Sequence, residues 1–239
     1  MTLPKIYDWE RVRLAIKQLH ETFPGFLETV VLVGGGAAWF YRETLRRWND
    51  PDFQVPLWTA AEQDDWLSKD VDFMGLKVTE AADLLSATFD ETTHTFHYEG
   101  LEIDFLEAGL QIFPDTALQT ARLVQLSDFA FNVVEASLLF AEKTALMRAK
   151  KDRPQDKLHR QLLSEFLKCE FCRQAEHPAS LRPSRWIGRA RAVKTADFEF
   201  FENDPRISRR LIPAIAAVQA NEQRALKHWA KHHLPGYTE

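Results

Sequence analysis

The chain has 239 residues, of which 45% are hydrophobic, and its formal net charge is −5. This length and composition are sufficient for one large domain or two modest ones with a hydrophobic core. No stretch approaches the roughly 20 uninterrupted apolar residues that a membrane span needs, and the first residues lack the apolar segment of a signal peptide. We therefore expect a soluble cytoplasmic protein that does not bind a membrane.

The small net charge conceals an asymmetry along the chain. Residues 1–142 hold 10 Lys and Arg against 24 Asp and Glu, a net −14, whereas residues 143–239 hold 20 against 11, a net +9. A carboxylate-rich half suited to metal ions and a basic half suited to phosphates are typical of an enzyme that acts on nucleotides or nucleic acid. Two oppositely charged lobes that attract each other explain the asymmetry equally well.

The first elements in chain order are a helix, a strand and a second helix. Apolar residues recur at helical spacing over 8–22, after Asp8 as a plausible N-cap, and the sequence FPGF then breaks the helix. The short β-branched run at 29–33 predicts a buried strand that is closed by three glycines. Residues 37–48 then have the pattern of a helix.

The next part of the chain predicts further strands around one helix. A polar stretch with two prolines, at 49–67, predicts a surface insertion that serves as a lid or a partner contact. A strand follows at 70–74, and a helix is expected over 79–89. Two β-like runs, 93–98 and 101–106, flank a Glu-Gly pair and predict an antiparallel hairpin.

From about residue 118 the pattern is helical almost throughout, with proline-rich breaks. We therefore predict an α+β fold with a boundary near residue 115. A mixed β-sheet with flanking helices is expected over 1–115, and a helical domain over 116–239.

Acidic side chains mark two of the predicted strands. Side chains two apart in a strand project to one face, so Asp70 and Asp72 present adjacent carboxylates. Such like charges are costly unless a cation lies between them, and Mg²⁺ prefers carboxylate and phosphate oxygens. Asp104, on a strand that could lie beside the first, is the expected third ligand of a two-metal site, in competition with Glu102 on the same face.

The glycines precede a predicted helix. At Gly34, Gly35 and Gly36 the backbone N–H groups and the helix dipole are suited to hold a triphosphate. Alone, a glycine turn or an Asp-x-Asp pair is a weak signal. The ordered set of strand, glycine turn, helix, Asp-x-Asp strand and further acidic strand predicts a metal-dependent phosphate site.

This ordered set resembles the DNA polymerase β-like nucleotidyltransferase superfamily. The matching segments are VLVGGGAAWFY at 31–41, SKDVDFMG at 68–75 and LEIDFLEAG at 101–109, and Ser68 stands where the family has a serine or threonine before its first aspartate. The resemblance implies a nucleotidyltransferase fold and Mg²⁺-dependent transfer of a nucleoside monophosphate from a nucleoside triphosphate. The separation of the glycines from Asp70 exceeds the family's usual spacing, so the insertion between them is expected to reshape the entrance.

A second stretch, residues 138–163, resembles AbiEii-type nucleotidyltransferases, which occur as toxins in toxin–antitoxin pairs. The residues that fit the pattern are Lys143, Arg148, Lys150, Asp152 and Asp156. By this resemblance Lys143 contacts the nucleotide phosphates, and Asp156 orients that lysine or activates the acceptor hydroxyl. The implied acceptor is the 3′ end of a tRNA or a side chain of a partner protein, in a toxin–antitoxin or phage-defence system. An amphipathic helix with a solvated basic end is the structural alternative.

The C-terminal third lies outside the resemblance. Its basic stretch contains Arg182, Arg185, Trp186, Arg189, Arg191 and Lys194, followed by Arg206, Arg209 and Arg210. Basic residues near an aromatic ring suit RNA, although solvated surface has the same composition. Cys169 and Cys172 lack the further ligands of a zinc site, and the cluster of His228, His232 and His233 is expected at the surface.

Two other functions fit the sequence. The first is a non-catalytic protein that keeps the fold and binds a partner or a nucleic acid, which the presence of all three carboxylates disfavours. The second keeps the chemistry but transfers the nucleotide to a small molecule, which the basic helical half disfavours.

Overall fold

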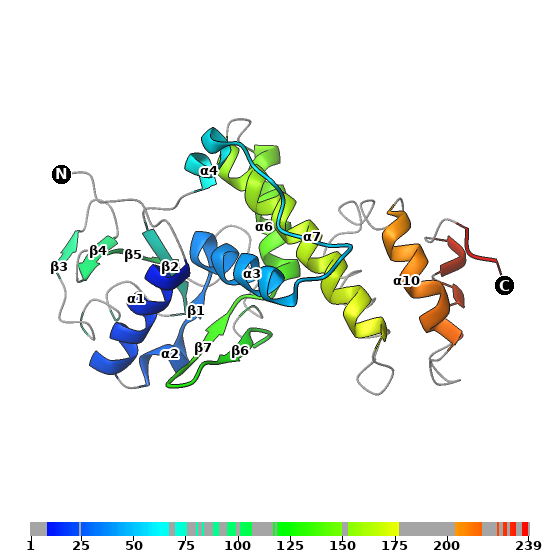
Figure 1. The fold of residues 1–239 in the computed structure, drawn as a ribbon. Coiled ribbons are helices and arrows are strands. Elements are labelled where there is room, and N and C mark those ends of the chain that lie inside the picture. The colour runs from blue at the N-terminus through cyan, green and yellow to red at the C-terminus, as the bar shows by residue number, and fades with distance from the viewer. Residues whose placement is uncertain are drawn as a thin grey trace. The chain divides into compact units, whose positions relative to one another are not determined.

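The protein is described here by a computed structural model. It describes residues 9–23, 25–66, 70–75, 80, 83, 88–90, 95–98, 101–106, 117, 119–149, 153–176, 204–216, 224, 227, 228, 230–232 and 236–238. These residues form a mixed α/β fold (Figure 1). Its elements are α1 (Trp9–Thr22), α2 (Phe26–Thr29), β1 (Val31–Leu32), α3 (Gly34–Trp48), α4 (Ala60–Trp66), β2 (Asp70–Met74), β3 (Thr88–Asp90), β4 (Thr95–Tyr98), β5 (Leu101–Leu106), β6 (Arg122–Gln125), β7 (Ala130–Val133), α6 (Ala136–Ala149), α7 (Pro154–Glu176) and α10 (Pro205–Ala216).

The strands form one seven-stranded sheet in the order β3-β4-β5-β2-β1-β7-β6. β2 pairs in parallel with β5 and β1 in parallel with β7, whereas the other neighbouring pairs are antiparallel. The sheet is therefore mixed, as the sequence predicts. The predicted hairpin is also confirmed, because β4 and β5 pair antiparallel from Thr95 opposite Asp104 to Tyr98 opposite Leu101.

One face of the central strands is packed with apolar side chains. Val71 and Phe73 of β2 and Ile103 and Phe105 of β5 are each at most 4% exposed. The ring of Phe26, from α2, lies 6.0 Å from that of Phe73 and 5.8 Å from that of Phe105. Since side chains alternate along a strand, the acidic residues of β2 and β5 project from the opposite face.

Helices α1 and α3 pack on β7 through aromatic rings. Trp9 lies 5.7 Å from Phe40 and 6.2 Å from Phe131, and Phe40 contacts Phe131 edge-on at 6.0 Å. Next to Phe40, the hydroxyl of Tyr41 donates a hydrogen bond to the Val134 carbonyl at 2.5 Å. These contacts fix α3, and with it the glycines at its first turn, relative to the sheet.

The elements around the glycines have different bounds from those predicted. The predicted strand at 29–33 is shorter, because Thr29 ends α2 and only Val31 and Leu32 pair with neighbouring strands. The helix predicted over 37–48 begins earlier, at Gly34. The N–H of Ala37 donates to the Val33 carbonyl at 3.1 Å, and this bond draws the three glycines into the first helical turn.

The predicted change to helices near residue 118 comes too early, because two further strands precede α6, α7 and α10. β6 and β7 follow that point and join the edge of the sheet, where they pair with each other and β7 pairs with β1. A strand of four residues depends on its partners, so its own sequence is a weak signal.

Most of the helix expected over 79–89 lies outside the described residues, but its last residue, Phe89, belongs to β3.

Two compact units make up the chain, and none of the boundaries between them falls near residue 115. Unit 1 comprises Met1–Thr44 and Leu57–Leu163, and unit 2 comprises Leu45–Pro56 and Ser164–Glu239. The predicted cut at 115 therefore lies within unit 1, because β6, β7, α6 and the first part of α7 belong with the sheet. α3 and α7 each contribute residues to both units.

The predicted insertion at 49–67 contains a short helix, α4, whose first turn is capped. The Glu62 N–H donates to Thr59 Oγ1 at 3.2 Å, and the Thr59 N–H donates to the Glu62 carboxylate at 2.9 Å. This reciprocal pair is a capping box. Among the described helices, none is long and apolar enough to cross a membrane.

Candidate functional site

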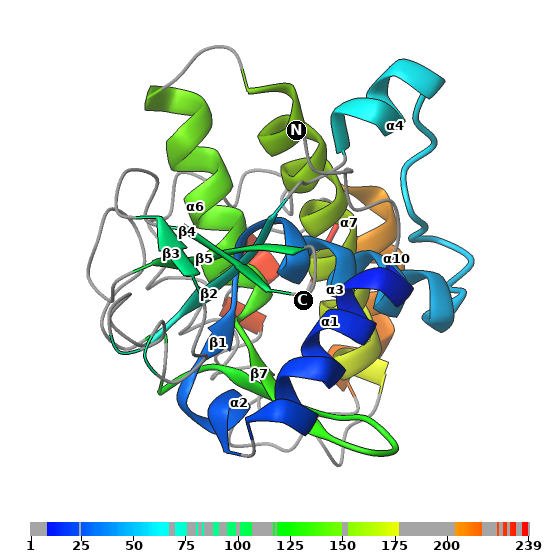
Figure 2. The same ribbon diagram turned by 90° about the vertical axis from the view of Figure 1, so that its left-hand side faces the viewer.

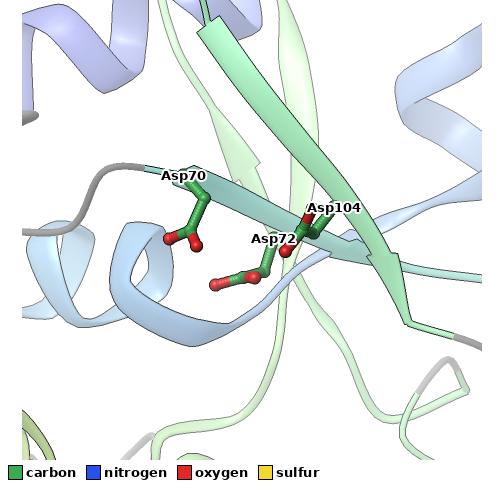
Figure 3. Close-up of side chains that lie close together, drawn as sticks. All are labelled: Asp70, Asp72 and Asp104. Carbon is green, nitrogen blue, oxygen red and sulfur yellow. The ribbon is translucent and has the colours of Figure 1, made fainter. Parts of the chain in front are cut away.

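Three aspartates come together where β2 and β5 run side by side (Figure 3). Asp72 lies directly opposite Asp104 in the parallel register, and Asp70 precedes Asp72 by two residues on the same face. One carboxylate oxygen from each aspartate lies within 4.8 Å of the other two. Glu102 lies opposite Asp70 in the register but is not part of this cluster. Asp104, rather than Glu102, is therefore the third member of the carboxylate triad.

Asp72 stands at the electrostatic centre of the triad. Burial, the neighbouring charge of Asp70 and, to a smaller extent, the charges of Asp104 and Glu142 raise its pKa, Lys143 opposes them, and the result is a pKa of about 7. A carboxylate crowded by other carboxylates is stabilised by a cation among them. The donor set of three carboxylates fits a hard divalent cation such as Mg²⁺. Of the described residues, only this triad forms a cluster able to hold a metal ion.

Gly34 packs directly against Asp72. Its φ of +58° lies in the left-handed region, and a Cβ at this position would lie 1.8 Å from Asp72 Oδ2. Both the backbone conformation and the space therefore require glycine. A Cβ on Gly36 would lie 2.9 Å from Leu32 Cδ1, a side-chain end. Gly35 is buried in the same turn, so the amino end of α3 lies against the triad.

The predicted partners Lys143 and Asp156 are joined by an ion pair. Lys143 Nζ, on α6, lies 3.2 Å from Asp156 Oδ1 on α7, and these helices run side by side (Figure 2). Both residues are at most 5% exposed. Burial acts to lower the pKa of Lys143, but the charges of Glu142, Asp156 and Asp72 outweigh it and raise the pKa above its ordinary value. The ammonium therefore stays charged.

Two charged residues that the sequence analysis did not identify complete this group. Glu142 Oε2 lies 3.1 Å from Lys143 Nζ, and Arg153 Nε lies 2.7 Å from Asp156 Oδ2. Burial raises the pKa of Glu142, although Lys143 opposes the shift. Arg153 precedes Asp156 by three residues, a helical spacing that could have been recognised. Glu142 adjoins Lys143 in sequence, and adjacent helical residues point in different directions, so no periodic signal indicated their contact.

Several predicted site residues cannot be placed beside these groups. Ser68, Lys150 and Asp152 lie outside the described residues, as do His233 and the basic stretch from Arg182 to Lys194. Arg148 belongs to α6. The remaining arginines of the predicted RNA-binding region, Arg206, Arg209 and Arg210, form ion pairs with carboxylates of unit 2.

The cysteine pair and the histidine cluster lie apart from the triad in sequence. Cys169 and Cys172 are free and buried on α7, and burial raises the pKa of Cys169 to about 12, so its thiol stays protonated. The rings of His228 and His232 lie 4.8 Å apart, with both residues exposed.

Comparison with known proteins adds no family to this description. No protein-family model matches the chain, and no curated protein is significantly similar to it.

Proposed function

We propose that the protein is a Mg²⁺-dependent nucleotidyltransferase that moves a nucleoside monophosphate from a nucleoside triphosphate to an acceptor hydroxyl. The observation that carries the proposal is the carboxylate triad beside the glycine turn. Asp70, Asp72 and Asp104 gather their oxygens within 4.8 Å, and Gly34 leaves no room for a side chain next to Asp72. A metal-binding cluster and backbone N–H groups at a helix start are the two parts needed to hold a triphosphate.

Each group has a defined part in the proposed reaction. Asp70, Asp72 and Asp104 hold Mg²⁺, and the amino end of α3 binds triphosphate oxygens through its N–H groups. When bound, Mg²⁺ stabilises negative charge on the attacking and leaving oxygens. Lys143 adds a fixed positive charge for the phosphates, and its 3.2 Å contact with Asp156 orients it.

The proposed chemistry is a substitution at the α-phosphorus. The acceptor oxygen forms a bond to that phosphorus, and the bond to the oxygen that bridges the α- and β-phosphates breaks. Pyrophosphate leaves with the electron pair, and a carboxylate of the site takes the proton of the acceptor hydroxyl. The resemblance to AbiEii-type proteins supports a tRNA 3′ end or a partner protein as acceptor and a toxin–antitoxin or phage-defence setting.

Transfer of a radioactive label tests the proposal. Purified protein is incubated with Mg²⁺, total tRNA, cell lysate and each of the four α-labelled nucleoside triphosphates. We expect label in an RNA or protein band for the wild type and none for Asp70→Ala/Asp72→Ala. Asp65→Ala removes an exposed carboxylate of α4 and is the matched control, so it is expected to retain transfer.

The negative outcomes of this assay are informative. Absence of label under every condition, or equal labelling by the double variant, would contradict the enzymatic function. If the wild type then still bound tRNA or a lysate protein, the non-catalytic binding function would take its place. Label on a small molecule alone would move the acceptor to that class while leaving the transferase chemistry intact.

A further inference from the structure

Lys143 is enclosed by more negative charge than one ammonium balances. Its side chain is 7% exposed, and its Nζ lies 3.1 Å from Glu142 Oε2 and 3.2 Å from Asp156 Oδ1. The charge of Asp72 also raises the pKa of Lys143, and Lys143 in turn lowers that of Asp72. The ammonium therefore has three carboxylates within its electrostatic reach, one of which belongs to the triad.

The group of Glu142, Lys143, Arg153 and Asp156 is neutral without the triad. Asp156 binds Arg153 through Oδ2 and Lys143 through Oδ1, and Glu142 supplies the second carboxylate. Two cations and two anions make this four-residue group neutral. The four-residue group therefore needs no charge from the triad.

Removal of Glu142 would break this balance. Lys143, Arg153 and Asp156 would together carry one excess positive charge, and the Lys143 ammonium is buried, where an unbalanced charge is costly. Asp72 is the remaining carboxylate whose field already reaches Lys143. An ammonium drawn to Asp72 competes with a metal ion for the same oxygens.

We propose that Glu142 is a positioning residue that holds the Lys143 ammonium on the side of α7 and so keeps Asp72 available to the metal ion. This role rests on the proposed function, because it assumes that the triad binds a divalent cation. Glu142 is not part of the motif around Lys143 or of the glycine turn, so neither of these patterns assigns it this role. Glu142 acts through Lys143 and is not itself a metal ligand.

A double-mutant cycle with metal binding as the readout tests this role. Mn²⁺, which takes the same oxygen ligands, is titrated at mildly alkaline pH into the wild type, Glu142→Gln, Lys143→Gln and the double variant, and free Mn²⁺ is measured by electron paramagnetic resonance. We expect Glu142→Gln to raise the Kd by roughly tenfold when Lys143 is present. In the Lys143→Gln background the same change is expected to have little effect, because no ammonium remains to be displaced.

Two controls separate the proposed role from simpler effects. Glu28→Gln removes an exposed carboxylate of α2 in the same unit and is expected to leave the Kd unchanged. Glu142→Asp shortens the side chain but keeps its charge, and it is expected to restore part of the affinity. Circular dichroism of each variant verifies that the fold is retained.

The outcomes distinguish this inference from the proposed function. If Glu142→Gln raises the Kd by the same factor with and without Lys143, the effect is that of a lost charge and the positioning role is wrong. An unchanged Kd in Glu142→Gln also contradicts it. If the wild type binds no Mn²⁺, or binds it as well as Asp70→Ala/Asp72→Ala does, the metal site itself and the proposed function fail.

Discussion

At the scale of single residues, the close contact between Gly34 and Asp72 has the most direct consequences for the candidate metal site. The glycine has a left-handed backbone, and its missing side chain leaves the space that Asp72 Oδ2 fills. A change at either residue therefore acts on the other. Their contact connects the start of α3 to the face of β2 that carries the triad.

The structure predicts different outcomes for two glycine substitutions. Gly25 and Gly34 both have a positive φ, but a Cβ on Gly25 would meet nothing within 4 Å. Gly25→Ala is expected to cost about 1 kcal/mol of stability from backbone strain alone. Gly34→Ala adds a clash with Asp72, so we expect it also to weaken Mn²⁺ binding on the order of tenfold or more. Thermal unfolding and Mn²⁺ titration of both variants measure the two effects, and equal Mn²⁺ affinities would contradict the importance of this contact.

The raised pKa of Asp72 predicts a pH dependence. Its folded-state pKa of about 7 exceeds its ordinary value of 3.8, so the metal-free folded protein holds this proton more tightly than the unfolded chain. The contribution of Asp72 to stability is therefore present at low pH and declines as the pH rises from about 4 through 7. A metal ion displaces the proton, so Mn²⁺ affinity is expected to rise over the same range.

Asp72→Asn isolates this effect from other titrating groups. Urea unfolding in EDTA, repeated across the pH range, gives the difference in stability between the wild type and Asp72→Asn. We expect the wild type to lose stability relative to Asp72→Asn as the pH rises. A difference that is independent of pH would show that Asp72 titrates near its ordinary value.

At the scale of elements, the segment around α4 differs from the polar insertion that the sequence indicated. Trp66 is 1% exposed and stacks on Trp58 at 4.7 Å, and it meets Trp39 of α3 and His159 of α7 edge-on at 5.6 and 4.3 Å. The guanidinium of Arg42 lies 4.6 Å from the centre of the Trp39 ring. These contacts anchor residues 57–66 on the rest of unit 1.

Two substitutions in this segment measure its anchoring. Trp66→Ala removes the central ring of a buried cluster and is expected to destabilise unit 1 by about 3 to 5 kcal/mol. Leu57→Ala alters a fully exposed side chain and is expected to change stability by less than about 0.5 kcal/mol. Urea unfolding compares the two variants with the wild type. A small effect of Trp66→Ala would favour the lid that the sequence suggested.

The elements that could be predicted from sequence are those with local signals. Alternation places Asp70 and Asp72 on one face, and a short turn places Asp104 in a hairpin strand, so the members of the triad are predictable. The parallel register that sets Asp72 opposite Asp104 depends on strands far apart in sequence. Likewise, the contact of Lys143 with Asp156 depends on how α6 and α7 pack. Periodicity does not report such packing.

For the whole molecule, the division into two compact units separates the candidate metal site from a network of ion pairs. The triad and the group around Lys143 belong to unit 1. In unit 2, Arg206 pairs with Glu165 at 2.9 Å and with Asp204 at 2.6 Å, and Lys168 lies 3.0 Å from Asp204. The described arginines of the predicted RNA-binding region, Arg206, Arg209 and Arg210, thus have carboxylate partners within their own unit.

A buried ion pair of unit 2 joins Arg210 to Asp50 at 2.9 Å, with side chains 12% and 3% exposed. Burial acts to raise the pKa of Asp50, but hydrogen bonds from Arg210 and from the backbone N–H groups of Asp52 and Phe53 outweigh it and hold the pKa below its ordinary value. Loss of Arg210 would leave a buried carboxylate without its cation, which costs about 3 to 5 kcal/mol. Arg209 provides a matched comparison, because its side chain is 65% exposed in its ion pair with Asp52.

We therefore expect Arg210→Met to destabilise unit 2 by several times more than Arg209→Met, whose exposed pair contributes about 1 kcal/mol or less. Hydrogen exchange followed by peptide is the suitable measurement, because two compact units need not unfold together. In Arg210→Met, exchange is expected to accelerate in 164–176 and 205–216 while 70–74 and 101–106 keep their protection, and Mn²⁺ affinity is expected to be unchanged. Faster exchange in the strands that carry the triad would show that the ion pairs of unit 2 also maintain the metal site, and the two units would then act as one cooperative structure.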